Sequence, residues 1–319
     1  IAYMSDAFEN TSYSDSLSAG FDLAVSEFGE DAVGAFATSW WDAHDEINRL
    51  AGAGVKDFVV TAPVVGRGMD EIASGLPHNR FAVLDSSGDQ PNVQYVNFAG
   101  HEGSFLVGAV AALRSQSNII GFVGGQPYPV TLSLQAGFEA GARYVRPDVE
   151  LLVEYLTPEP DIGGFASMAF AQAKTEPLYR AGADVIFHAV GFAGRGVFEA
   201  ARVESVRQGR QLWAIGADTD EYSTVLNESL TEFGGPDPRT SQPHVLTSMI
   251  KRWDVAVHTV INDFATDQFR PGTRVLRLAD GGVGYSTSGG FIDDLVPTIE
   301  DLKARIIAGE IVVPEAPSA

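Results

Sequence analysis

Cysteine is absent from this chain of 319 residues. Its absence excludes disulfide bonds, thiol nucleophiles, iron–sulfur clusters and thiolate zinc sites. Positive charge is scarce as well, because 21 lysines and arginines are outnumbered by 42 aspartates and glutamates, which gives a formal net charge of −21. A surface with such an excess of negative charge repels phosphate backbones and anionic lipids. The composition therefore argues against a nucleic acid or a membrane surface as a partner.

Long apolar runs are also missing, since no stretch approaches the roughly 20 residues that a membrane-spanning helix requires. We therefore expect a chain that is soluble as given. No signal peptide is visible, and Ile1 opens directly on an apolar run, so we expect the N-terminus to have been trimmed. The length predicts two domains, each large enough to bury its own core.

Signatures of catalysis and of cofactor binding are missing too. The sequence contains no Walker A loop, no G-x-S-x-G nucleophile elbow and no H-E-x-x-H zinc motif. The histidines show no spacing typical of metal ligands, so we expect no metal and no cofactor. These absences favour a binding function over catalysis. The six histidines are His44, His78, His101, His188, His244 and His258.

Short β-rich runs alternate along the chain with longer amphipathic stretches, which predicts parallel sheets covered by helices. The predicted strands are Ile1–Met4, Ala32–Ala37, Asp57–Thr61, Arg80–Leu84, Val93–Asn97, Ile119–Val123, Glu150–Tyr155, Val185–Ala189, Leu212–Ala217, Val275–Leu278 and Val283–Tyr285. The predicted helices are Tyr13–Glu27, Asp42–Leu50, Val65–Ala73, Gly103–Arg114, Val130–Tyr144, Gly164–Ala181, Gly194–Arg207, Val245–Phe264 and Ile299–Ala308.

The alternation occurs twice, with a polar break at Ser115–Asn118 and a second break, rich in turn residues, at Phe233–Arg239. Two doubly wound sheets of this kind form a cleft, and ligands bind at the carboxyl ends of their strands. Residues that follow strands are therefore the candidates for a binding site.

In the first half of the chain, polar and aromatic side chains follow two strands. Asp6, Asn10, Tyr13 and Ser14 come after the first predicted strand, where helix capping explains only part of the set. Asn97 ends the fifth strand, and its amide offers both the donor and the acceptor needed to recognise the edge of a heterocycle.

In the second half, a glycine-rich turn and a carboxylate follow strands. Gly191, Gly194 and Gly196 would let the backbone approach a ligand at the start of a helix, and Phe192 between them is a candidate stacking surface. Asp218 follows Leu212–Ala217, and a carboxylate there can accept two hydrogen bonds from a vicinal diol. A solvated acidic turn remains the alternative reading of that segment.

The chain resembles the basic membrane protein family, also called the purine nucleoside receptor A family, whose members are substrate-binding lipoproteins of ABC importers. Seven motifs in the family's order carry the resemblance. They are Phe8–Ser14, like the family's F-D-D-K-S-F-N, then Glu102–Leu106, Gly121–Gly125, Gly194–Ala201, Ile215–Asp220, Thr247–Arg252 and Asp280–Gly284.

The resemblance implies an α/β protein with the type I periplasmic-binding fold, in which two doubly wound parallel-sheet lobes are joined by a three-strand hinge that closes on the ligand. The crossovers would fall near residues 119, 245 and 278. The N-terminal lobe would comprise residues 1–118 and 245–277, and the C-terminal lobe residues 119–244 and 278–319.

The resemblance also implies roles for the site residues in binding a purine nucleoside. Tyr13 and Phe192 would sandwich the base, Asp6 and Asn97 would read its edge, and the ribose would be held by Asp218, Lys251 and the backbone of Gly191 and Gly194. The family pattern places a phenylalanine and an asparagine where this chain has Tyr13 and Ser14, so the identity of the base is open.

We accordingly expect a monomeric, extracytoplasmic binding protein that delivers its ligand to the membrane subunits of an ABC permease, with a lipid anchor in the full-length precursor. Three alternatives stay open. The ligand can be another flat heterocycle such as riboflavin. The chain can be a nucleoside-processing enzyme that uses Glu9 or Asp220 as its acid or base. It can also be the ligand-sensing module of a receptor or regulator.

Overall fold

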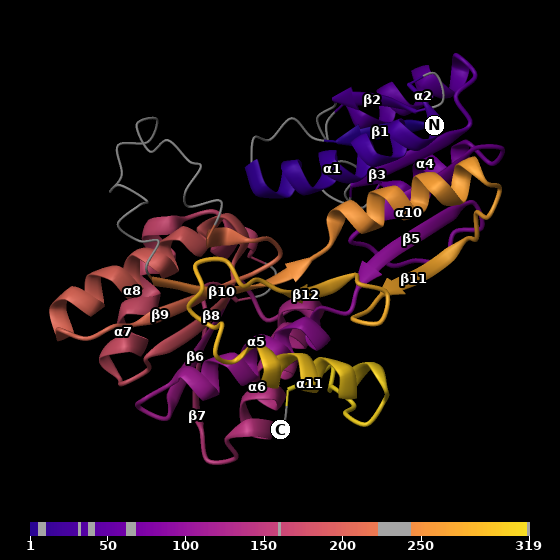
Figure 1. The fold of residues 1–319 in the computed structure, drawn as a ribbon. Coiled ribbons are helices and arrows are strands. Elements are labelled where there is room, and N and C mark those ends of the chain that lie inside the picture. The colour runs from indigo at the N-terminus through magenta and orange to yellow at the C-terminus, as the bar shows by residue number, and fades with distance from the viewer. Residues whose placement is uncertain are drawn as a thin grey trace. The chain divides into compact units, whose positions relative to one another are not determined.

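The chain forms two compact units in the computed structural model (Figure 1). The first unit consists of Ile1–Ala99 and Arg252–Gly282, and the second of Gly100–Lys251 and Val283–Ala319. The chain therefore passes from one unit to the other three times. The structure describes residues 1–5, 11–30, 33–37, 42–61, 68–158, 161–222 and 244–317.

The sheet of the first unit has the strand order β11-β5-β4-β3-β1-β2, and all of its pairs are parallel. Its central strands are apolar on both faces, as Phe58, Val59 and Val60 of β3 illustrate, because helices cover both sides of a parallel sheet. The strands are β1 (Ala2–Ser5), β2 (Gly34–Ala37), β3 (Asp57–Thr61), β4 (Arg80–Leu84), β5 (Val93–Phe98) and β11 (Gly272–Leu276).

The helices of the first unit are divided between the two faces of this sheet. Helices α2 (Ala43–Gly52) and α4 (Met69–Gly75) bury their apolar residues in one core together with strand residues such as Phe58. On the opposite face lie α1 (Thr11–Phe28) and α10 (Trp253–Ala265), which pack against each other, and Phe21 of α1 stacks on Tyr3.

The sheet of the second unit has the order β12-β10-β9-β8-β6-β7, and β12 pairs with β10 in the antiparallel direction while the other pairs are parallel. The unit thus repeats the plan of the first with one strand reversed. The strands are β6 (Ile119–Gly124), β7 (Glu150–Tyr155), β8 (Val185–Ala189), β9 (Trp213–Gly216), β10 (Val245–Lys251) and β12 (Val283–Tyr285).

Helices again cover both faces of the second sheet. Helices α7 (Met168–Arg180) and α8 (Gly194–Gln208) share one core with its strands. On the other face lie α5 (Gly100–Arg114) and α6 (Pro129–Val145), and α11 (Val296–Ile307) packs on α5. Two short 3-10 helices, η1 (Ile162–Phe165) and η2 (Gly191–Ala193), precede α7 and α8.

The prediction of two doubly wound parallel-sheet domains is confirmed, but the prediction of one helix over Val245–Phe264 is wrong. Its first part is strand β10, which lies between β9 and β12, and α10 begins only at Trp253. A buried apolar run has no periodicity that separates a strand from a helix, so the sequence pattern could not decide between them. The helix predicted over Gly164–Ala181 is likewise divided into η1 and α7, with Ser167 capping the start of α7.

The observed crossings lie at residues 99–100, 251–252 and 282–283, whereas the family resemblance implied crossings near 119, 245 and 278. Helix α5 belongs to the second unit because it packs against α6 there. Strand β10 belongs to it because it pairs with β9.

Candidate ligand-binding site

The carboxyl ends of four neighbouring strands of the second unit lie at one edge of its sheet. These strands are β10, β9, β8 and β6, which follow one another in the sheet and run parallel. Lys251 ends β10, Asp218 follows β9, Phe192 follows β8 and Gln126 follows β6. The fold therefore gathers the charged and aromatic candidates of the second half along one edge. The sequence predicted that Asp218 and Phe192 follow strands, but it did not predict this position for Lys251 or Gln126.

Asp218 and Lys251 form an ion pair at this edge. The Nζ atom of Lys251 lies 3.1 Å from Oδ1 of Asp218, and the backbone N–H of Lys251 donates to the Asp218 carbonyl at 3.1 Å. The Lys251 side chain is only 5% exposed, while that of Asp218 is 39% exposed. A buried ammonium group requires a partner, and the more exposed carboxylate can still receive hydrogen bonds from a ligand.

Lys251 reaches this position as the last residue of a strand, which corrects its predicted place on a long helix. Asp218 adopts the left-handed backbone conformation with φ +70°, which aspartate tolerates better than most residues. This turn directs the chain back toward the end of β10 immediately after Ala217.

Phe192 lies in η2 with 51% of its surface exposed, although its neighbours Val190 and Ala193 are buried. Gly191 before it has φ +52°, a conformation that favours glycine. A half-exposed ring held between two buried residues in a tight turn offers a face for stacking on a flat ligand.

The two other glycines of this turn have a packing role. A Cβ atom at Gly194 would overlap the ring of His188, and one at Gly196 would overlap the backbone carbonyl of Met168 on α7. The close fit of α8 against β8 and α7 thus accounts for both glycines. The assignment of Gly194 to a ligand contact remains a prediction.

A buried polar cluster that was not predicted from the sequence lies behind the turn. His188 on β8 is fully buried, and its Nε2 atom lies 2.8 Å from Oε2 of Glu221, while its ring packs edge-on against Phe198. Arg195 on α8 is half-buried, and burial lowers the pKa of its guanidinium while the charge of Glu221 opposes that shift. The cluster ties the segment after β9 to the start of α8.

Gln126 is a second residue that the sequence analysis missed. It follows β6, it is 8% exposed, and its Oε1 atom is buried with no hydrogen-bond partner within the described residues. The signal was the same as for Asp218, a polar residue directly after an apolar strand, here after Gly124 and Gly125.

In the first unit, Asn97 on β5 is the only predicted site residue whose side chain the structure describes. Its Nδ2 atom donates to Ser87 Oγ at 3.0 Å, and its Oδ1 atom accepts from the N–H of Phe98 at 2.8 Å. An amide has two donors and two lone pairs, so half of its hydrogen-bonding capacity remains. Asp6 and Asn10 lie outside the described residues, as do the side chains of Tyr13 and Ser14.

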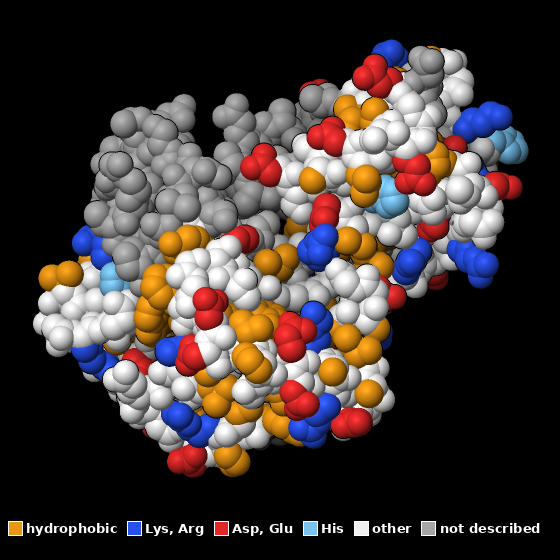
Figure 2. All heavy atoms as spheres, viewed as in Figure 1, with side chains coloured by type: hydrophobic (Ala, Val, Ile, Leu, Met, Phe, Trp, Pro, Cys, Tyr) orange, Lys and Arg blue, Asp and Glu red, His pale blue; other side chains and the backbone are white. Residues whose placement is uncertain are grey.

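The described residues include no group of histidines and carboxylates that could hold a metal ion, and no helix that is both long and apolar enough to cross a membrane. Asp220, proposed as an acid or base, accepts a hydrogen bond from Ser288 Oγ, and Glu9 lies outside these residues. Acidic and basic side chains are intermixed on the face visible in Figure 2.

With this geometry in view, comparison with known proteins identifies the relatives of the chain. Residues 2–316 match the family described as Bmp, ABC transporter substrate-binding protein PnrA-like. The chain belongs to this family. Its members are the substrate-binding components of ABC transporters and not enzymes, so the chain is a solute-binding protein and the alternative of a nucleoside-processing enzyme is set aside.

Two curated relatives illustrate the match. The chain is 35% identical over 253 residues to the CD4+ T-cell-stimulating antigen of Listeria monocytogenes, covering 78% of this chain and 67% of the relative. It is 31% identical over 250 residues to the ABC transporter nucleoside-binding protein BmpA of Lactococcus lactis, covering 76% of this chain and 66% of the relative.

Solved structures show the same fold. An ABC transporter solute-binding protein from Aeropyrum pernix aligns with a TM-score of 0.73 at 22% identity, covering 98% of this chain and 94% of the other. A LacI family transcriptional regulator from Enterococcus faecium with bound ribose aligns with a TM-score of 0.57 at 16% identity, covering 90% of this chain and 97% of the other. The predicted type I periplasmic-binding fold is thus confirmed.

Proposed function

We propose that this solute-binding protein captures an uncharged purine nucleoside (adenosine, guanosine or inosine) and delivers it to the permease of an ABC importer. The observation that carries the proposal is that the buried Lys251, paired with Asp218, and the half-exposed ring of Phe192 all follow or end strands at the same edge of one sheet. A nucleoside presents a flat base and a vicinal diol, and these two groups match a stacking ring and a carboxylate. The Lactococcus relative, named a nucleoside-binding protein, supports the same class of ligand.

In this proposal, each group has one task. The Phe192 ring stacks on the base, and such stacking contributes about 1–3 kcal/mol per base. The Asp218 carboxylate accepts hydrogen bonds from the ribose hydroxyls, and Lys251 holds that carboxylate in place. Gly191 and Gly194 add backbone contacts to the ribose.

The first unit supplies the remaining contacts in this proposal. Tyr13 forms the second face of the sandwich, while Asp6 and Asn97 read the edge of the base with help from Asn10 and Ser14. Because residues of both units contact the ligand, its binding energy favours closure of the hinge over the open state. We further propose an extracytoplasmic location with a lipid anchor in the precursor, and a monomeric protein.

The charges of Lys251 and Asp218 at the carboxyl edge of the sheet provide a test of the proposal. Lys251 is already neutralised by Asp218, so a ligand phosphate finds no spare cation in this pair. We expect adenosine, guanosine or inosine to raise the thermal midpoint of the protein, and the corresponding 5′-monophosphates to leave it unchanged at equal concentration. Thermal denaturation with a ligand panel measures both.

Native mass spectrometry of the purified protein identifies any ligand that is retained. A bound mass equal to that of a purine nucleoside supports the proposal. A flavin mass, or stabilisation by riboflavin and not by nucleosides, overturns it in favour of another flat heterocycle. Equal stabilisation by nucleosides and by their monophosphates contradicts the proposed preference for an uncharged ligand.

A further inference from the structure

The buried His188 on β8 contacts two segments of the second unit that carry candidate site residues. One is the turn η2 with Phe192, and the other is the segment after β9, which contains Asp218 and Glu221. The Nε2 atom of His188 lies 2.8 Å from Oε2 of Glu221. An ionised carboxylate only accepts hydrogen bonds, so in the neutral imidazole it is Nε2 that carries the proton and donates it to this bond.

The ring of His188 also limits the position of the turn that carries Phe192. A Cβ atom added at Gly194, two residues after Phe192, would overlap the imidazole, so the backbone of Gly194 lies directly against the ring. Phe198 on α8 packs edge-on against the same imidazole, with the ring centroids 5.2 Å apart. The end of η2 and the start of α8 therefore rest on His188.

The segment that follows β9 is attached to the strands on both sides of β9. The carbonyl of Asp218 accepts from the N–H of Lys251 at 3.1 Å, and the N–H of Glu221 donates to Oγ of Ser248 at 3.2 Å. Both of these bonds lead to β10. The carboxylate of Glu221 bonds instead to His188 on β8, the neighbour of β9 on its other side. This bond thus links the segment of Asp218 to the strand that leads into the turn of Phe192.

The surroundings of Glu221 hold its carboxylate in one place. Arg195 on α8 is half-buried, and the negative charge of Glu221 opposes the lowering of the arginine pKa by burial. Gly216, the last residue of β9, leaves the space that the arrangement needs, because a Cβ atom there would lie 2.6 Å from Ser248 Oγ and 3.0 Å from Glu221 Oε2. The Glu221 side chain is only 17% exposed.

We propose, on the basis of the nucleoside-binding function proposed above, that His188 and Glu221 form a positioning pair for the ligand site. The pair sets the distance between the ring of Phe192 and the carboxylate of Asp218 without contacting the ligand. A ligand that joins a flat base to a vicinal diol satisfies both groups at once only when this distance fits. The pair therefore makes the protein selective for an intact nucleoside over the base alone.

Calorimetric titration of purine nucleosides and of their 9-methyl bases measures this selectivity. A 9-methyl base keeps the flat ring and lacks the ribose, so the ratio of the two affinities reports how well both contacts are made together. We expect the wild-type protein to bind at least one nucleoside at least tenfold more tightly than its 9-methyl base. The probes are adenosine, guanosine and inosine, with 9-methyladenine, 9-methylguanine and 9-methylhypoxanthine.

Three variants at one position separate hydrogen bonding from charge. Glu221→Met removes the carboxylate and should lower the affinity ratio at least fivefold, while the affinity for the 9-methyl base changes less than twofold. Glu221→Asp keeps the charge near Arg195 but is one methylene group shorter, so it should lower the ratio as well. Glu221→Gln keeps an oxygen that accepts from His188 and should retain at least half of the ratio. If Glu221→Met is unfolded in thermal denaturation, Glu221→Asp decides alone.

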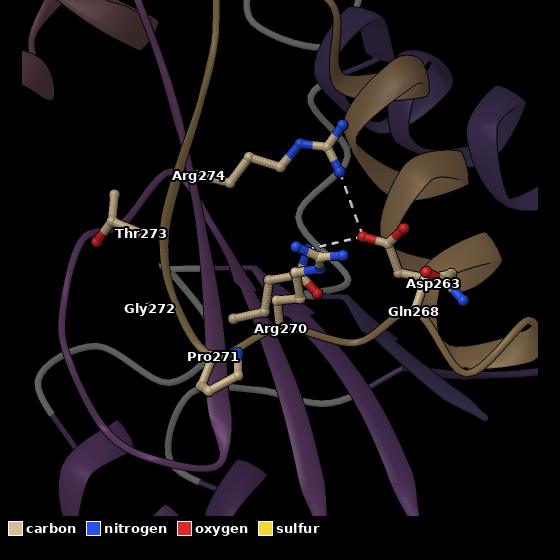
Figure 3. A pocket seen from close by; sticks show the side chains of 8 residues that line it. Asp263, Gln268, Arg270, Pro271, Gly272, Thr273 and Arg274 are labelled. Carbon is tan, nitrogen blue, oxygen red and sulfur yellow. Dashed lines mark hydrogen bonds and ion pairs between the residues drawn. The ribbon is translucent and has the colours of Figure 1, made fainter.

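Asp263 on α10 provides a matched control in the first unit. Its side chain is 13% exposed, and its Oδ2 atom accepts a hydrogen bond of 2.8 Å from the buried Gln94 on β5, with an arginine nitrogen of Arg274 at 3.3 Å (Figure 3). Asp263→Leu thus removes a carboxylate with burial and partners similar to those of Glu221. It should leave the affinity ratio unchanged.

The outcomes distinguish the positioning role from the nucleoside-binding function. An undiminished ratio in Glu221→Met and Glu221→Asp, or a wild-type ratio near one, overturns the positioning role alone. Equal weakening of nucleoside and 9-methyl base, or an equal fall of the ratio in Asp263→Leu, also overturns it, because a general loss of stability explains either result. A wild-type protein that binds none of the three nucleosides overturns the proposed function and the positioning role together.

Discussion

Single residues of the candidate site have physical roles that follow from their burial. Lys251 is nearly inaccessible, and an ammonium group at such a position is stable only when a carboxylate compensates it. Asp218 supplies that carboxylate and remains more than a third exposed. Oδ1 of Asp218 is buried and faces Lys251, so the exposed part of this carboxylate is what remains available to hydroxyl donors, while the pair offers little to a second anion.

The variant Asp218→Asn tests whether the Asp218 carboxylate accepts hydrogen bonds from the ribose. Asparagine keeps the shape and tolerates the left-handed backbone, but it accepts weaker hydrogen bonds and places an amide beside Lys251. We expect the wild-type protein to prefer a ribonucleoside over its 2′-deoxy analogue by about 1.5–3 kcal/mol, the contribution of one charge-assisted hydrogen bond. In Asp218→Asn this preference should fall below about half of that value.

Calorimetric titration with the two nucleosides measures the preference in both proteins. Asp161→Asn, at an exposed carboxylate that caps η1, is the control and should retain the wild-type preference. An undiminished preference in Asp218→Asn would remove Asp218 from the ribose site.

The sequence indicated which residues follow strands, but it did not show which of them contact each other in the folded protein. Asp218, Phe192 and Lys251 were identified as candidates because each lies near the end of an apolar segment or in a family motif. The contact of His188 with Glu221 joins residues 33 positions apart, and only the order of strands in the sheet brings them together. Gln126 follows an apolar strand as Asp218 does, but the burial of its unpartnered oxygen is a property of the folded environment that the sequence does not show.

At the scale of helices and strands, close backbone contact between α5 and α6 determines how these two helices of the second unit pack against each other. A Cβ atom at Gly108, Gly137 or Gly141 would overlap a backbone carbonyl of the opposite helix. Small residues at these points let the two helices approach without an intervening side chain. The sequence predicted both helices but not this contact, since glycine inside a helix usually lowers the stability of the helix and does not by itself indicate close packing.

Gly141→Ala tests the contact. Alanine is the better helix former by about 0.5–1 kcal/mol, yet the overlap with the Phe105 carbonyl should outweigh that gain, because overpacking costs about 1–3 kcal/mol. We expect the thermal midpoint to fall by several degrees. Gly52→Ala on α2, where the added methyl group meets no atom, is the matched control and should leave the midpoint unchanged or raise it. A fall in both variants, or in neither, would contradict the packing argument.

At the scale of the whole molecule, the topology was predicted more reliably than the boundaries. Alternating strands and helices indicated two doubly wound sheets, because a parallel sheet requires apolar strands and covering helices. The points at which the chain changes unit depend on which sheet a segment joins, and local patterns do not contain that information. Strand β10 illustrates this, since its pairing with β9 assigns it to the second unit.

The central claim is that the exposed ring of Phe192 holds the flat base of a nucleoside. The most direct test is a calorimetric titration of purine nucleosides into the wild-type protein and into Phe192→Ala. Phe170→Ala, which removes another exposed phenylalanine of the second unit, is the control. We predict that Phe192→Ala weakens binding by about 1–3 kcal/mol, the contribution of one stacked base, and that Phe170→Ala leaves the affinity unchanged. Equal affinities for the wild-type protein and Phe192→Ala would contradict the claim.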